Sequence, residues 1–190
     1  MLNFTQILSV SLILFSVINI LGSVPIIINL RKKMGHIQSG KATIVAGVIM
    51  ILFMFAGDNL LGLFGISVGD FAIAGSIIMF IIGMEMILGV NIFKNEPNAS
   101  NSSSVVPIAF PLIAGAGTLT TIISIKAEYD ELNILVGIII NLAFVYLVLK
   151  STNWLERKIG EGGIGVMQKI FGIILLSIAI KLFKDNIGNI

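Results

Sequence analysis

Two clusters of glycine, proline and hydroxyl-bearing residues lie inside otherwise apolar stretches of the chain. The first begins at Asn19 and ends at Pro25 (NILGSVP), and the second begins at Pro111 and ends at Thr121 (PLIAGAGTLTT). Proline removes a backbone donor and clashes with the preceding helical turn, and glycine costs about 1 kcal/mol relative to alanine inside a helix. Both clusters therefore predict an interrupted helix.

Interrupted helices leave backbone groups that can bind a ligand. The amino end of a half-helix presents unpaired N–H groups and attracts an anion, whereas unwound carbonyl groups attract a cation. A zwitterion such as an amino acid needs both kinds of group within a few ångströms. Small residues also allow close helix packing, which is the alternative interpretation of either cluster alone. Two interruptions at corresponding places favour a substrate site.

Two further polar residues lie within apolar stretches. Glu85 follows Gly83 and Met84, where a carboxylate is costly by about 2.5 kcal/mol or more. Because hydrocarbon disfavours the charged form, Glu85 is a candidate proton carrier, or else it pairs with a base such as Arg31. Asn141 either lines the site or forms a hydrogen bond between helices. The predicted substrate-binding residues are Asn19, Gly22, Ser23, Pro25, Pro111, Gly115, Gly117, Thr118, Thr120, Thr121 and Asn141, with Glu85 as the proton-coupling candidate.

The composition requires an apolar environment around these residues. Of 190 residues, 56% are hydrophobic and 12% are charged, the net charge is +2, and the mean hydropathy is +1.05. Soluble domains carry roughly 25% charged residues, so this chain is expected in a lipid bilayer. Cysteine is absent and His36 is the only histidine. Thiol catalysis and soft-metal clusters are therefore excluded, and no metal, cofactor or nucleic acid is expected as a partner.

Six apolar stretches are long enough to cross a bilayer as helices, which takes about 20 residues. They cover residues 5–30, 41–63, 71–92, 105–125, 132–149 and 166–183. These runs are continuous rather than alternating, which argues against the strands of a barrel. The first run is too long for a signal peptide and no basic residue precedes it, so it is expected to remain as the first helix.

Basic residues indicate how the helices are oriented. They follow the first stretch, at residues 31–33 (RKK), and the fifth, at residues 150–169. Basic loops favour the cytoplasmic side, so both termini are expected outside a cytoplasmic (plasma or inner) membrane. A low-complexity linker at 95–104 divides the single transmembrane domain into halves, residues 1–94 and 105–190. The predicted fold is an all-α membrane protein with six transmembrane helices as two inverted three-helix repeats, in which helices 1 and 4 are interrupted.

Both clusters resemble motifs of the MarC family of integral membrane proteins, also called the small neutral amino-acid transporter family. NILGSVP keeps the glycine and the final proline of a motif similar to Asp-Pro-x-Gly-Asn-x-Pro, and PLIAGAG matches Pro-Leu-x-x-Gly-Pro-Gly except at one position. Segments 64–86 and 162–175 are also similar, so the resemblance covers nearly the whole chain. The departures are Asn19, Ile20, Ser23 and Ala116, in place of the family's Asp, Pro, Asn and Pro. The change at position 19 removes a candidate cation or proton site.

The resemblance implies membership of the lysine-exporter-like superfamily and transport of alanine, glycine and similar small amino acids. We therefore expect a secondary transporter, working as an exporter by alternating access, with a proton or sodium ion as coupling ion. Membrane lipid and a homo-oligomer are the other expected partners. A non-transporting membrane scaffold is the main alternative. An intramembrane enzyme is less favoured, because Ser23 would need a general base and no membrane-embedded histidine or lysine is evident.

Overall fold

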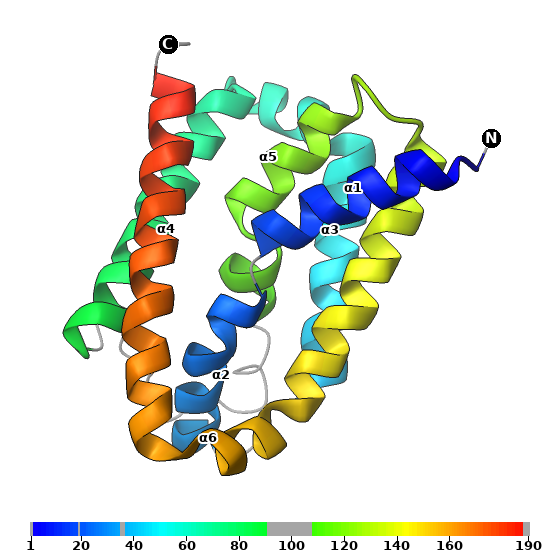
Figure 1. The fold of residues 1–190 in the computed structure, drawn as a ribbon. Coiled ribbons are helices and arrows are strands. Elements are labelled where there is room, and N and C mark those ends of the chain that lie inside the picture. Colours follow the sequence, from blue (N-terminus) through cyan, green and yellow to red (C-terminus); the bar gives the residue numbers. More distant parts are fainter. Residues whose placement is uncertain (1, 19, 35–36, 91–107, 188–190) are drawn as a thin grey trace.

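The computed structural model describes the whole chain except residues 1, 19, 35–36, 91–107 and 188–190 (Figure 1). The described residues form helices and short connections, and none of them is in a strand. The elements are α1 (Phe4–Ile18), α2 (Ile20–Met34), α3 (Ser39–Leu63), α4 (Val68–Leu88), the short π-helical η1 (Ile108–Ile113), α5 (Ala116–Ile125) and α6 (Glu131–Ile187).

Helix α6 is two helices joined at a bend. Gly160 has φ 68° and ψ 171°, a backbone conformation that favours glycine because it has no Cβ. The bend separates two apolar segments, Glu131–Thr152 and Gly162–Ile187, which are long enough to span a membrane. Together with α3 and α4, the described part of the chain has four helices of this kind. The prediction of an all-helical membrane protein is confirmed at this level.

The other two predicted spans are each divided into shorter segments. The first consists of α1 and α2, and these two helices run in clearly different directions in Figure 1. The second consists of η1 and α5, which are separated by Ala114 and Gly115. The predicted interruptions are therefore present. The linker at 95–104 lies outside the described residues, and the two inverted repeats stay a prediction.

The first predicted cluster contains the start of α2. Gly22 and Pro25 belong to α2, which begins at Ile20, and Asn19 lies outside the described residues. Proline loses its own backbone donor and clashes with the carbonyl four residues before it. For Pro25 this is the carbonyl of residue 21, in the first turn of α2. The weakened turn therefore lies at the start of α2, and the helix continues after Pro25.

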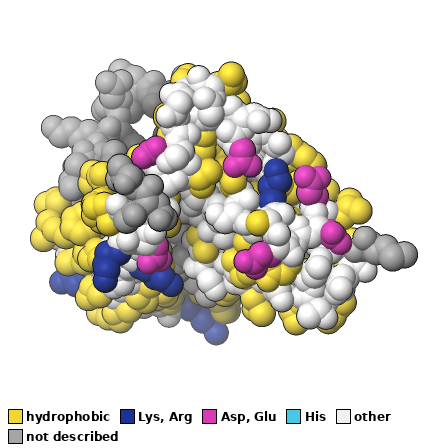
Figure 2. Space-filling model, turned by 90° about the horizontal axis from the view of Figure 1, so that it is seen from above, with side chains coloured by type: hydrophobic (Ala, Val, Ile, Leu, Met, Phe, Trp, Pro, Cys, Tyr) yellow, Lys and Arg dark blue, Asp and Glu magenta, His cyan; other side chains and the backbone are white. Residues whose placement is uncertain are grey.

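Charged residues lie at both ends of the bundle. Both termini, the α3–α4 connection and the α5–α6 connection lie at one end (Figure 1). Figure 2, which views this end, shows both acidic and basic side chains, and Glu128, Asp130 and Glu131 are exposed there in the α5–α6 connection. The opposite end carries the bend of α6, with exposed Lys150 and Arg157. Which end faces the cytoplasm stays a prediction.

Candidate functional site

The amino end of α5 is buried at the second interruption. Gly115 is the N-cap residue, with extended backbone (φ −73°, ψ 167°), and no side chain caps the helix there. Gly115, Ala116, Gly117 and Thr118 are all buried. The first N–H groups of an α-helix have no acceptor within the helix. The partial positive charge of α5 is therefore directed into the interior of the bundle rather than into solvent or onto a capping side chain.

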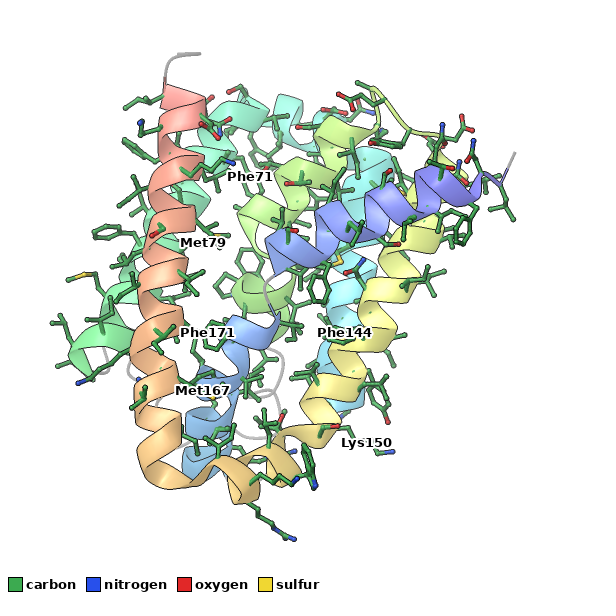
Figure 3. The ribbon with its side chains drawn as sticks, viewed as in Figure 1. Phe71, Met79, Phe144, Lys150, Met167 and Phe171 are labelled. Carbon is green, nitrogen blue, oxygen red and sulfur yellow. The ribbon has the colours of Figure 1, made fainter. Side chains whose placement is uncertain are left out.

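Gly117 is the point where four helices meet. A Cβ atom at this position would lie 2.9 Å from Cε of Met79 in α4 and 3.3 Å from Cδ2 of Leu182 in α6. It would also lie 3.7 Å from Cγ1 of Val17 in α1. Met79, labelled in Figure 3, is also close to Gly115, because a Cβ atom added to Gly115 would lie 3.5 Å from Cε of Met79. The side chains nearest to the α5 amino end are therefore apolar, and a side chain at Gly117 would require Met79 to shift.

The carboxyl end of α1 lies beside this amino end of α5. Val17 is in the last turn of α1, and the final carbonyl groups of a helix have no donor within it. Figure 1 shows the end of α1 and the start of α2 next to the lower end of α5. The partial negative charge of one half-helix thus faces the same region as the partial positive charge of another. This pairing of opposite backbone dipoles is what a small zwitterion would require.

The hydroxyl groups of the second cluster bind backbone carbonyls. Thr118 Oγ1 donates to the carbonyl of Ile113 at 3.1 Å, across the interruption, and thereby joins η1 to α5. Thr120 Oγ1 and Thr121 Oγ1 both donate to the carbonyl of Gly117, at 3.1 and 2.7 Å. These three residues therefore shape the interruption and the first turn of α5, a role that the sequence motif did not specify.

The first cluster contributes α2, which packs against η1. Ser23 and Pro25 are buried within α2. Pro111 is half-buried in η1 and follows Phe110, whose backbone is extended (φ −133°, ψ 132°). The structure thus brings the two clusters into neighbouring elements, while the amino end of α5 is contacted by α1, α4 and α6.

Asn141 and Glu85 lie apart from this region. Nδ2 of Asn141 donates to the carbonyl of Ser11 in α1 at 3.1 Å and to that of Gly137 at 2.9 Å. Asn141 therefore bonds α6 to α1 about two turns before the interruption, which agrees with its interpretation as an interhelical contact. Glu85 is in the last turn of α4, six residues beyond Met79, or about 9 Å along the helix axis.

Three residues of the site were missed by sequence reasoning: Val17, Met79 and Leu182. Each is an ordinary apolar residue in an apolar helix, so nothing in its type marks it. A weak signal existed for α4, where small residues recur at positions 72, 75, 76 and 83 and indicate close packing. One of them, Gly75, lies directly against Ala116 at the start of α5.

The described residues contain no group of three or more histidine, cysteine, aspartate or glutamate side chains that could hold a metal ion. Fold and site together define a multi-helix integral membrane protein with two divided helices. The chain belongs to the MarC family of integral membrane proteins, whose family model matches residues 4–190.

Curated relatives cover almost the whole chain. A UPF0056 membrane protein of Pyrococcus abyssi is 34% identical, covering 92% of this chain and 90% of the relative. One from Methanocaldococcus jannaschii is 32% identical over 92% of each chain. One from Escherichia coli K12 is 30% identical, covering 93% of this chain and 89% of the relative. No solved structure matches the chain.

Proposed function

We propose that this protein is a secondary transporter, rather than an enzyme, that exports small neutral amino acids such as alanine or glycine by alternating access. One observation carries the proposal: the buried and uncapped amino end of α5 lies beside the carboxyl end of α1. Non-helical backbone at membrane depth is tolerated where it lines a site buried in protein. Divided helices whose ends face a common region are the usual substrate sites of transporters.

The backbone dipoles suggest how the substrate is oriented. Its carboxylate would accept hydrogen bonds from the N–H groups at the start of α5, at Ala116, Gly117 and Thr118. Its ammonium group would face the terminal carbonyl groups of α1, near Val17. Neither contact requires a charged side chain of the protein, so the binding energy favours a zwitterion over a substrate with net charge.

The side chains around Gly117 suggest a limit on substrate size. Val17, Met79 and Leu182 converge within 4 Å of a Cβ placed at Gly117. These three side chains are uncharged and offer no partner for a polar or ionised substrate side chain. A substrate whose own side chain is a hydrogen atom or a methyl group fits this environment best.

The proposal includes a topology of six spans in two inverted repeats. The divided pairs α1–α2 and η1–α5 each replace one span, and they occupy the first position of their respective halves. The end with the RKK segment and the bend of α6 would face the cytoplasm, because basic residues are retained there. Both termini would then lie outside the cytoplasmic membrane.

Transport can be measured directly with purified protein in liposomes. We expect liposomes loaded with unlabelled alanine or glycine to accumulate the labelled amino acid by counterflow, because exchange needs only a site that alternates between the two sides. Protein-free liposomes, and liposomes loaded with glutamate or lysine, serve as controls. Absence of counterflow for every small neutral amino acid would contradict the proposal.

Glu85 is proposed as the coupling residue. Replacing Glu85 with glutamine removes the ability to carry a proton, while the side chain keeps its size and its capacity for hydrogen bonds. We expect E85Q to retain alanine counterflow within about two-fold of the wild-type rate but to lose transport driven by a proton gradient. Glu128→Gln, at an exposed position in the α5–α6 connection, should change neither. If E85Q still responds to the proton gradient, Glu85 does not carry the coupling proton.

A further inference from the structure

A short segment of α6 lies between its two long apolar parts. Residues 153–159 follow Glu131–Thr152 and precede Gly162–Ile187, with the bend at Gly160 immediately after them. Figure 1 shows this segment, in gold, at the end of the bundle opposite the chain termini. Because both flanking helices have the length and composition of membrane spans, the segment between them lies at the membrane surface.

One face of this segment is packed against the protein. Leu155 and Ile159, four residues apart and so on the same side of the helix, pack with Val24 and Ile28 of α2 and with Ile164. The inner face is thus covered by the second half of the divided first helix.

The other face carries aromatic and basic side chains. Trp154 is 57% exposed, and Nζ of Lys158 lies 4.9 Å from the centre of its ring. One turn earlier, Nζ of Lys150 lies 5.8 Å from the ring of Tyr146, and Figure 3 shows Lys150 pointing away from the bundle. Arg157 is also exposed. Tryptophan and tyrosine prefer the membrane interface, where lysine and arginine attract anionic headgroups.

The charge of this end supports an anionic ligand. In this stretch the sequence has three basic residues, Lys150, Arg157 and Lys158, against two acidic ones, Glu156 and Glu161. Exposed apolar surface adjoins these basic residues, because Leu147, about one turn before Lys150, is 59% exposed. A ligand with an anionic head and an apolar tail fits both parts at once.

We propose that Lys150, Trp154, Arg157 and Lys158 form a binding surface for the headgroup of an anionic phospholipid. The phosphate lies between the basic side chains, the indole ring of Trp154 lies at headgroup depth, and the acyl chains follow the apolar surface of α6. This surface is separate from the substrate site, and it does not depend on the transport function.

Trp154 provides the test, because it is the only tryptophan in the chain. The protein is reconstituted in phosphatidylcholine bilayers that contain phosphatidylglycerol, with one of the two lipids brominated high on its acyl chains. Quenching of Trp154 fluorescence then gives the relative binding constant of the two lipids. We expect phosphatidylglycerol to bind roughly 100-fold more tightly, since each of the three basic residues contributes about five-fold. The preference should weaken as salt increases.

The variant Arg157→Gln/Lys158→Gln should lower this relative constant roughly 25-fold, to the contribution of Lys150 alone, whereas Lys181→Gln/Lys184→Gln, near the opposite end of α6, should leave it unchanged. Circular dichroism checks that both variants fold. If the first variant does not fold, the salt dependence of the wild-type protein decides. Equal quenching by the two lipids, an undiminished preference for phosphatidylglycerol in the first variant, or loss of that preference in millimolar inorganic phosphate would each overturn the proposal.

Discussion

Replacing Gly117 with leucine should abolish alanine counterflow while leaving the protein folded. A Cβ atom at position 117 would already lie 2.9 Å from Met79 and 3.3 Å from Leu182. A full leucine side chain has to occupy the region where the proposed substrate carboxylate meets the first turn of α5. Because the neighbouring atoms are the ends of flexible side chains, the variant can fold at a cost of about 1–3 kcal/mol. The expected loss of counterflow is more than roughly ten-fold, which corresponds to about 1.4 kcal/mol.

A graded series separates loss of the site from loss of stability. Gly117→Ala should reduce counterflow less than Gly117→Leu, because the methyl group requires only a small shift of Met79. Adding Met79→Ala to Gly117→Ala should restore transport, since it removes the atom that the new Cβ meets. Gly62→Leu is the matched control, because nothing lies within 4 Å of a Cβ at this position in α3. It should transport at the wild-type rate.

The measurements are counterflow in liposomes and the thermal unfolding midpoint in detergent, with and without alanine. We expect alanine to raise the midpoint of the wild-type protein and of Gly62→Leu but not that of Gly117→Leu, since only a folded protein with an intact site is stabilised by its ligand. Counterflow by Gly117→Leu at the wild-type rate would show that the amino end of α5 is not the substrate site.

The sequence was sufficient to predict the interruptions because their cause is local. Proline and glycine act on the turn that contains them, so each cluster indicates a break in its own stretch. The first cluster, residues 19–25, contains the start of α2 at Ile20, so Gly22 and Pro25 are helical. The second break falls at Ala114 and Gly115, inside the predicted cluster, where extended backbone at Gly115 starts a new helix.

The partners of the site could not be predicted, because they depend on how distant segments pack. Val17, Met79 and Leu182 come from three different helices, and no local pattern indicates that they meet at Gly117. Asn141 illustrates the opposite case. Its type and place predicted either a site residue or an interhelical bond, and the structure shows the bond, from Asn141 to the carbonyl of Ser11. A single sequence lists the polar residues within the membrane but does not say which of them share a surface.

The contact between Gly75 and Ala116 should be essential for the position of α5. A Cβ atom at Gly75 would overlap the Cβ of Ala116 and would lie 3.2 Å from its Cα and 3.6 Å from its backbone nitrogen. These atoms belong to the backbone or are attached to it, so α4 and α5 have to separate. We expect Gly75→Ala to destabilise the protein by about 3 kcal/mol, at the upper end of the usual cost of overpacking.

The size swap Gly75→Ala/Ala116→Gly tests whether this contact is the cause. Ala116→Gly alone removes the obstructing methyl group and costs at most about 1 kcal/mol of helix propensity. If the steric contact explains the cost, the double variant should be more stable than Gly75→Ala alone, with a coupling energy of about 1–3 kcal/mol in a double-mutant cycle of unfolding free energies. Additive effects would mean that Gly75 is required for another reason. Counterflow gives a second test of the steric explanation. If restored packing returns the amino end of α5 to its place beside Met79 and Val17, counterflow should recover together with stability in the double variant.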